Sequence, residues 1–306
     1  MSAHVFCRDL CLARGEPLAG TGKLAQRTLL LRWPRGKWRV PRFESADMSP
    51  TLSEAVRLAM QAGIHVALVD RTGEFDALPH LQAEGIAADY DSDAALAEAI
   101  TRFTAGTPLS GRPDTRTTIL CCTDSRRDAC CARYGFATFK ALRAAADPEK
   151  INLLQATHVG GCRFAASLVV LPQRQRYGRL SPEEAPAFLA ALERGEIYIS
   201  AYRGRPDLPE AIQAAEVAAL AWAEKRGIAQ ADVHIHAQPT IPPQEGAELS
   251  LAARAGPTRL HLRLRAEILP VNGRCDALNE GMEPEMTPRW SVAAIAEATN
   301  HREIST

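Results

Sequence analysis

The sequence lacks any apolar run long enough to cross a bilayer. One of its longest, SLVVLP at 167–172, is far shorter than the roughly 20 residues that a spanning helix needs. The first residues, MSAHVFCRDLCLARGEP, carry charges where a signal peptide has an apolar segment. We therefore expect a cytoplasmic protein without a membrane partner.

The sequence also lacks an excess of charge of either sign. Lys and Arg together number 36, and Asp and Glu together also number 36. A chain with no net charge provides no general attraction for a phosphate backbone, so we expect no nucleic-acid partner. The apolar share of 46% and the charged share of 24% are typical of a globular protein.

Several motifs with a known chemistry are missing. The chain has no internal repeat of fixed period and no C-x-x-C pair. It has no Ser-His-Asp arrangement or pair of acidic residues whose spacing supports hydrolase chemistry. These absences disfavour a hydrolase and weaken, without removing, the case for a thiol–disulfide enzyme.

Cysteine is what the sequence does have, and it is clustered. The stretch CCTDSRRDACCARYG at 121–135 holds four of the eight cysteines. In a reducing cytoplasm such cysteines are metal ligands or redox thiols more often than disulfides. The stretch therefore marks the candidate site.

The pattern of apolar residues predicts an α/β fold in three parts. A smaller N-terminal α/β segment at 1–110 has strands over 28–34 and 65–70 and helices over 49–63, capped by Ser49 or Thr51, and 92–106. A middle domain at 111–205 has strands over 117–122 and 151–159, a helix over 129–146 capped by Asp128, a hairpin over 164–180 and a helix over 181–195. A C-terminal part at 206–306 has a helix over 209–227 and strands near 232–238, 247–254 and 258–268. The element order of the middle domain is that of a thioredoxin-like domain.

Two short loops of the middle domain carry the candidate ligands. Cys122 and Cys131 follow the first strand of this domain, and His158 and Cys162 follow the second. Loops at the ends of neighbouring strands meet at one edge of a sheet, so these four side chains form a site for one tetrahedral metal ion or a two-iron cluster.

Local features around the ligands favour a cluster. Cys131 lies in the first turn of a predicted helix, where the positive end of the helix dipole is expected to lower the pKa of a thiol. Gly160 and Gly161 have no Cβ, so the backbone can approach inorganic sulfide and direct N–H groups toward it. We expect these two glycines to form the cluster pocket.

The motifs CTDSRRDACC, HVGGCRFAA and YGRL, together with GEPLAGT and LLLRWPRGKW near the N-terminus, resemble the sucrase/ferredoxin-like family over roughly residues 7–205. That resemblance implies a thioredoxin-like [2Fe-2S] ferredoxin domain. It implies that Cys122 and Cys131 bind one iron and that His158 binds the other. The family has a second histidine where this chain has Cys162, so we predict three cysteines and one histidine.

The resemblance implies a non-enzymatic role, in which the chain carries single electrons between a reductase and an acceptor. Three thiolates and one neutral imidazole leave the oxidised cluster with one negative charge. Its potential should therefore lie between roughly −400 mV for plant-type ferredoxins and about −150 to +300 mV for bis-histidine centres.

Two other readings of the cysteines stay open. The same ligands could hold structural zinc, since Cys₃His is an ordinary zinc site, or a cysteine pair could serve a thiol–disulfide oxidoreductase. We expect Cys121 and Cys130 to be small buried residues rather than ligands, although either could replace a ligand if the loop shifts. We expect no metal role for Cys7 and Cys11, which one helical turn would align, and a structural role for Cys275.

Overall fold

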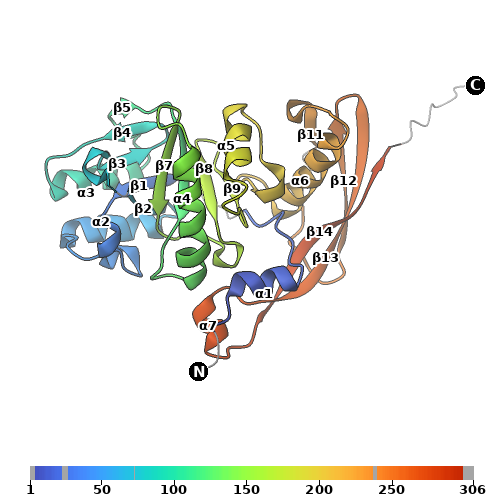
Figure 1. Cartoon of the computed structure of the whole chain (residues 1–306), viewed down its shortest axis with the longest axis horizontal. Helices are drawn as coiled ribbons and strands as arrows, with labels where there is room; N and C mark the ends of the chain where they lie inside the picture. Colours follow the sequence, from blue (N-terminus) through green and yellow to red (C-terminus); the bar gives the residue numbers. More distant parts are fainter. Residues whose placement is uncertain (1–3, 23–26, 72, 237–239, 299–306) are drawn as a thin grey trace, which may run out of the picture.

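The computed structural model describes residues 4–22, 27–71, 73–236 and 240–298. Figure 1 shows a large sheet with its helices on one side of the molecule and a smaller, strongly elongated sheet on the other. The large sheet has ten strands in the order β10-β9-β8-β6-β7-β2-β1-β3-β4-β5, and the smaller sheet has four in the order β11-β12-β13-β14. The fold is α/β, as the sequence predicts.

The middle of the chain forms a thioredoxin-like unit. Its elements are β6 (Thr117–Cys122), α4 (Phe136–Ala145), β7 (Ile151–Ala156), β8 (Leu168–Leu171), β9 (Gln175–Tyr177) and α5 (Ala185–Glu193). Strand β6 pairs parallel to β7 and antiparallel to β8, and β8 pairs antiparallel to β9. This βαβ unit followed by a hairpin and a helix confirms the element order predicted for this region.

The N-terminal elements repeat the same arrangement. They are β1 (Thr28–Arg32), α2 (Pro50–Gln61), β2 (His65–Asp70), β3 (Leu81–Ala83), β4 (Ile86–Ala88) and α3 (Asp93–Thr104). Strand β1 pairs parallel to β2 and antiparallel to β3, which pairs antiparallel to β4. The order β2-β1-β3-β4 therefore matches the order β7-β6-β8-β9, so the sheet contains two similar units that share no sequence repeat of fixed period.

The two units join edge to edge through their second strands. Strands β2 and β7 are antiparallel, with Val69 opposite Ala156 and Asp70 opposite Gln155. A short strand β5 (Arg112–Pro113) closes the N-terminal edge by pairing with β4. Strands before and after residue 110 therefore belong to the same sheet. The domain boundaries near 110 and 205 stay a prediction.

Alternate residues of the central strands face opposite sides of the sheet, as strand geometry requires. In β6, Ile119 and Cys121 belong to a core that includes residues of α4 and α5. Leu120 and Cys122 belong to a different core, which also contains Cys131 and Cys162. The neighbouring cysteines 121 and 122 are thus separated by the sheet itself.

The C-terminal part forms a helix and a second sheet, as predicted in outline. Its elements are α6 (Glu210–Glu224), β11 (Val233–Ile235), β12 (Glu248–Ala255), β13 (Thr258–Val271), α7 (Cys275–Asn279) and β14 (Glu285–Glu297). They follow β10 (Tyr202–Gly204), which pairs with β9 at the edge of the large sheet. The end of the strand predicted over 232–238 lies outside the described residues. Helix α7 and strand β14 were not predicted. Apolar side chains of α6 pack on one face of this sheet, with Trp222 and Trp290 in the same core.

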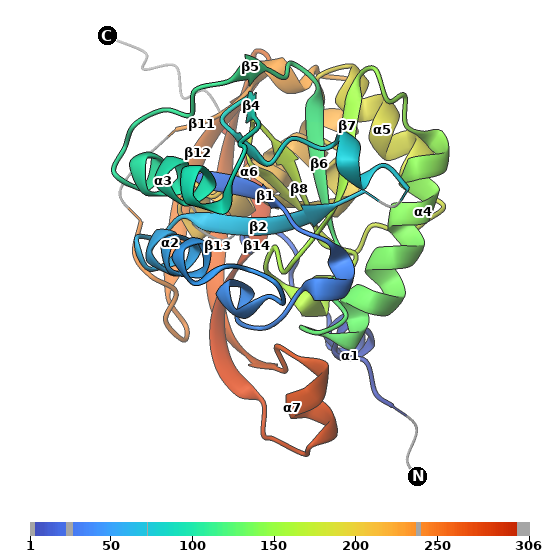
Figure 2. The same ribbon diagram turned by 90° about the vertical axis from the view of Figure 1, so that its left-hand side faces the viewer.

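The hairpin formed by β13 and β14 brings the C-terminal part back to the N-terminus. Helix α7 lies at its tip, beside α1 (Cys7–Ala13), in Figures 1 and 2. The Val5 N–H donates to Asn279 Oδ1 at 3.0 Å, and Asn279 Nδ2 donates to the Val5 carbonyl at 2.8 Å. Segments at opposite ends of the chain are therefore held side by side.

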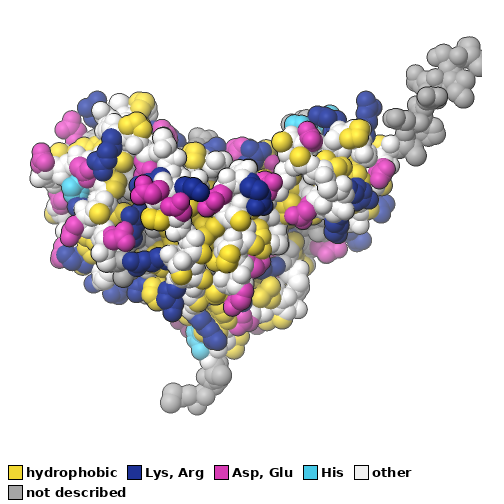
Figure 3. All heavy atoms as spheres, turned by 45° about the horizontal axis from the view of Figure 1, so that its top comes forward, with side chains coloured by type: hydrophobic (Ala, Val, Ile, Leu, Met, Phe, Trp, Pro, Cys, Tyr) yellow, Lys and Arg dark blue, Asp and Glu magenta, His cyan; other side chains and the backbone are white. Residues whose placement is uncertain are grey.

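Two surface properties follow from the composition. None of the helices in the described part of the chain is long and apolar enough to span a membrane. Basic and acidic side chains are interspersed over the face drawn in Figure 3, in keeping with equal numbers of the two.

The start of α2 provides a test of the fold. The Ser49 hydroxyl accepts a hydrogen bond from the Leu52 N–H at 3.4 Å, which identifies Ser49 rather than Thr51 as the cap. Ser49→Ala should lower the free energy of unfolding by about 1 kcal/mol, and Thr51→Ala, at an exposed position, by less than about 0.5 kcal/mol. Urea denaturation measures both; an equal loss for the two variants would contradict the assignment.

Candidate metal centre

The first pair of candidate ligands lies at the junction between β6 and α4. Cys122 ends the strand, and a helix begins at Ala129 after a loop. The Asp128 carboxylate accepts the Cys130 N–H at 2.8 Å, so Asp128 caps this helix as predicted. The helix then takes a π-helical turn over Cys131–Gly135. This turn places Cys131 Sγ 3.4 Å from Cys122 Sγ.

Gly135 makes the close approach of strand and helix possible. A Cβ at this position would lie 2.0 Å from the carbonyl oxygen of Cys122, which no side chain can tolerate. The backbone φ of Gly135 is −63°, so glycine is required here for space rather than for an unusual conformation. The contact fixes how far Cys131 lies from the end of β6.

The second pair of ligands follows β7. The Thr157 N–H donates to the Leu68 carbonyl at 2.9 Å, which extends the contact between the two units beyond the end of the strand. Next to it, the His158 N–H donates to Asp124 Oδ2 at 3.3 Å. A tight turn then leads to a short 3₁₀ segment over Cys162–Phe164. His158 Nδ1 lies 3.3 Å from Cys162 Sγ.

The N-terminal unit holds the backbone of His158 in place. The Arg42 guanidinium donates to the carbonyls of both Val66 and His158, and His65 Nε2 lies 3.3 Å from the same His158 carbonyl. Sequence analysis missed this role of Arg42 and His65, because both lie in another unit and no motif links them to the site.

Gly160 and Gly161 form the turn between the two second-pair ligands. Their φ values are 94° and 80°, a region that favours glycine. A Cβ on Gly161 would lie 2.7 Å from Arg203 Nη2, and Arg203 donates to the Gly160 carbonyl at 3.1 Å. The glycines therefore also make room for a buried arginine that sequence analysis did not single out.

The four predicted side chains come together in the fold. Cys122, Cys131 and Cys162 are buried, with exposed fractions of 1%, 0% and 3%, and His158 is half-buried. Cys121 does not join them: its thiol points to the other face and donates to the Gly135 carbonyl at 3.4 Å. Cys130 contacts a separate group of thiols.

The pKa values of the candidate ligands differ from one expectation. The hydrogen bond with Cys131 lowers the pKa of Cys122, and a hydrogen bond with the same thiol lowers the pKa of Cys162 to about 7. Its hydrogen bonds with these two sulfurs raise the pKa of Cys131 itself. The prediction that the helix start would lower the pKa of Cys131 is therefore wrong, since hydrogen bonds with two other sulfurs and burial raise it.

The imidazole responds to the same two sulfurs. Burial by itself lowers the pKa of His158, but hydrogen bonds with Cys122 and Cys162 outweigh it and raise the pKa to about 9. Thiols must lose their protons and an imidazole must be neutral to bind a metal. A metal ion bound by these side chains would therefore release protons, and a higher pH would favour its binding.

A pocket of about 460 Å³ reaches the second pair of ligands from outside. His158 and Cys162 line it, while Cys122 and Cys131 do not. Arginines contribute much of the remaining wall, namely Arg127, Arg163, Arg203, Arg274 and Arg289. The site therefore has a buried side and a side that opens toward a basic pocket.

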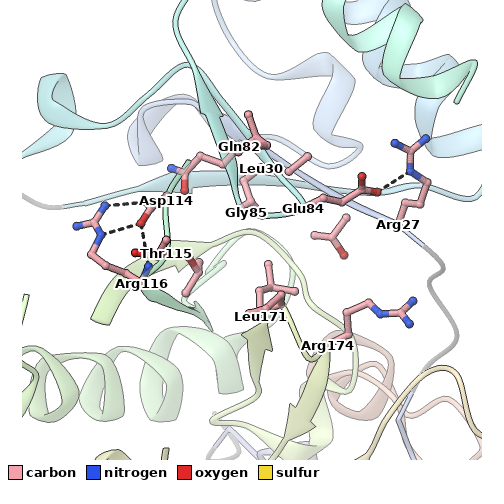
Figure 4. A pocket seen from close by; sticks show the side chains of 15 residues that line it. Arg27, Leu30, Gln82, Glu84, Gly85, Asp114, Thr115, Arg116, Leu171 and Arg174 are labelled. Atoms are coloured by element: carbon pink, nitrogen blue, oxygen red, sulfur yellow. Dashed lines mark hydrogen bonds and ion pairs between the residues drawn. The ribbon is translucent and has the colours of Figure 1, made fainter. Parts of the chain in front are cut away.

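A second cavity, of about 440 Å³, lies away from the candidate ligands between the β3–β4 turn and the end of β8 (Figure 4). Four of its charged side chains form two ion pairs, Arg27 with Glu84 at 2.8 Å and Arg116 with Asp114 at 2.8 Å, and Arg174 pairs with Asp207 at 3.9 Å. None of its lining residues is a cysteine or a histidine. This cavity offers no metal ligands of the kind found in the first pocket.

Comparison with known proteins identifies the family. The sequence model described as Sucrase/ferredoxin-like matches residues 18–204. The chain belongs to the sucrase/ferredoxin-like family. A search of curated proteins finds no match.

Two solved structures are similar to parts of this family member. A thioredoxin-like [2Fe-2S] ferredoxin from Aquifex aeolicus is 19% identical over 31% of this chain and 96% of its own, with a TM-score of 0.28. A crystal structure of the wild-type thioredoxin-like [2Fe-2S] ferredoxin from the same organism is 19% identical over 28% of this chain and 95% of its own, with a TM-score of 0.26. Similarity this distant says nothing about what this chain binds.

The role of Gly135 can be tested by substitution. Gly135→Ala should lower the free energy of unfolding by about 1–3 kcal/mol, because strand and helix must move apart to admit the methyl group. Gly36→Ala is the control, since a Cβ there has no neighbour within 4 Å. Urea denaturation of both variants measures the effect, and a Gly135→Ala protein as stable as the control would show that the contact is not restrictive.

Proposed function

We propose that this family member binds one [2Fe-2S] cluster through Cys122, Cys131, His158 and Cys162 and carries single electrons between protein partners. The observation that supports this most strongly is the meeting of two close ligand pairs, with 3.4 Å between the sulfurs of the first and 3.3 Å between the donors of the second. When bound, such a cluster accepts and donates one electron.

The donor chemistry fits an iron–sulfur cluster. Thiolates are the usual ligands of the irons, and histidine replaces cysteine in some two-iron centres. The ligands are arranged as two pairs, each following one of two parallel, adjacent strands. Gly135, Gly160 and Gly161 allow the backbone to pack closely around the four ligands. We assign Gly160 and Gly161 this role as cofactor-binding residues.

A single zinc ion fits this arrangement less well. The donors of a tetrahedral site all lie at similar distances from one another. Among the described residues, one group of possible ligands has all its donor atoms within 4.8 Å of one another, and it consists of other residues. The four candidate ligands do not form such a compact group. Hydrogen bonds also link Cys131 with Cys162 and His158 with Cys122, so the four donors form a ring that is wider than one tetrahedral site and fits two metal ions better than one.

A thiol–disulfide oxidoreductase is also disfavoured by the geometry. Its attacking thiolate has to reach a substrate disulfide, whereas Cys122 and Cys131 are almost completely buried. The pocket reaches Cys162, whose sulfur lies 3.3 Å from His158 Nδ1 rather than beside a second exposed thiol. A resolving cysteine at the pocket surface is missing among the residues that line it.

The protein's own side chains suggest how electrons enter and leave. Cys122 and Cys131 lie in the core, which excludes water from that side of the site. The half-buried His158 faces the basic pocket, so a partner protein that reaches the pocket comes closest to this ligand. We infer that a reductase and an acceptor dock here in the cytoplasm, without a role for nucleic acid or membrane.

Substitution of single ligands tests the assignment. Cys122→Ser, Cys131→Ser and Cys162→Ser should each lower the iron bound per chain by about tenfold or more, since loss of a residue that only orients a ligand already costs about 10–100-fold in metal affinity. Cys121→Ser is the matched control, because this neighbouring thiol faces the other side of the sheet. Iron analysis after anaerobic purification gives the result. Full iron in the Cys122→Ser protein, or its loss in the Cys121→Ser protein, would refute the ligand set.

Exchange of the two unequal ligands tests the charge of the site. His158→Cys adds a negative charge and should lower the reduction potential, whereas Cys162→His removes one and should raise it, each by on the order of 100 mV. Redox titration followed by electron paramagnetic resonance measures both. Shifts in the same direction, or no shift in either protein, would show that these residues are not ligands.

A further inference from the structure

A second group of metal-binding side chains lies next to the candidate centre. Cys130 Sγ is 3.6 Å from Cys7 Sγ and 3.3 Å from Cys275 Sγ, and these last two sulfurs are 3.7 Å apart. Asp128 Oδ1 lies 4.0 Å from Cys7 Sγ. The four donor atoms all lie within 4.8 Å of one another.

Three distant segments supply this group, and each sulfur lies at the start of a helix. Cys7 is the first residue of α1 and Cys275 the first residue of α7, while Cys130 follows the first residue of the helix that leads into α4. The Cys7 N–H donates to Cys275 Sγ at 3.4 Å, and the Arg8 N–H donates to Cys130 Sγ at 3.5 Å. Backbone donors at helix starts stabilise thiolates.

Asp128 orients two of the three cysteines. Its carboxylate oxygens accept the N–H of Cys130 at 2.8 Å and the N–H of Cys275 at 2.9 Å. The side chain is 2% exposed, and none of the ion pairs among the described residues includes it. A buried carboxylate usually has a cation as its partner, so a metal ion would supply the charge that is missing here.

We propose that Cys7, Cys130, Cys275 and Asp128 form a second, structural metal site that takes one zinc ion. In a tetrahedral site with Zn–S bonds of about 2.3 Å, neighbouring sulfurs are about 3.8 Å apart. The distances between the three sulfurs, 3.3 to 3.7 Å, need only a small expansion to reach this geometry. Asp128 completes the coordination or holds a water molecule that does.

Zinc fits this group better than the alternatives do. Thiolates with a carboxylate are common zinc ligands, and harder ions such as Mg²⁺ or Ca²⁺ prefer oxygen donors. The four donor atoms all lie within 4.8 Å of one another, a spacing that suits one metal ion better than the two irons of a cluster. A disulfide would use two of the sulfurs and leave the third cysteine without a role.

The site would tie both ends of the chain to the proposed electron-transfer centre. Cys130 precedes Cys131, so a metal bound to Cys130 fixes the helix start that presents a proposed cluster ligand. Cys275 lies in the connection between β13 and β14, next to the pocket residues Gly273 and Arg274. A bound zinc ion therefore stabilises one wall of the pocket as well as the contact between α1 and α7.

Metal analysis of the full chain tests this site separately from the cluster. The protein, purified anaerobically, should contain about one zinc per chain. The zinc content per chain should fall at least tenfold in Cys7→Ser and in Cys275→Ser. It should be unchanged in Cys11→Ser, since Cys11 is a buried thiol of the same helix α1 outside the group. Cys122→Ser should lose iron but keep zinc, so failure of one site is distinguished from failure of the other. Zinc retained in both Cys7→Ser and Cys275→Ser would overturn the proposal.

A second measurement covers the case in which these variants do not fold. Co²⁺ is added to the Cys122→Ser protein after its zinc has been removed with a chelator. The absorption bands of tetrahedral cobalt bound to thiolates should appear and saturate at about one equivalent. The proposal would be overturned if the purified protein contained no zinc and the cobalt titration gave no such bands. So would a metal-free protein in which mass spectrometry finds a disulfide between two of the three cysteines.

Discussion

The candidate centre depends on one contact, the approach of the Gly135 backbone to the carbonyl oxygen of Cys122. Cys122 ends a strand, and Cys131 lies in the first turn of the following helix. Their sulfurs can lie 3.4 Å apart only if the backbones of strand and helix come this close. The π-helical turn over Cys131–Gly135 is the local adjustment that accompanies the contact, and such turns are often found at functional sites. The remaining ligands are then added by the loop after β7, the strand next to β6.

The N-terminal unit supports the site although it contributes no ligand. Its elements repeat the order of the thioredoxin-like unit, but the loop after β1 contains no cysteine. Instead, Arg42 and His65 hold the His158 carbonyl, and the Thr157 backbone pairs with Leu68. One unit therefore supplies all the ligands of the proposed cofactor, while the other fixes the position of the half-buried ligand His158.

The sequence predicts those features that are local or that follow strand ends. β6 and β7 are short apolar runs between turn residues, and the candidate ligands follow them directly, so their meeting could be predicted from strand geometry. β14 was missed because most of its side chains are at least partly exposed and Pro288 interrupts the run. The group formed by Cys7, Cys130 and Cys275 was missed because its members are up to 268 residues apart, a separation at which no spacing rule applies. The pKa of Cys131 was mispredicted because it depends on hydrogen bonds between side chains from three segments.

Iron and sulfide analysis of the anaerobically purified protein, combined with electron paramagnetic resonance of the dithionite-reduced form, tests the central claim most directly. Binding of a two-iron cluster by Cys122, Cys131, His158 and Cys162 predicts about two irons and two acid-labile sulfides per chain, and a signal from one unpaired electron that appears only on reduction. A colourless protein that stays free of iron after reconstitution, or that holds zinc at these four residues, would contradict it.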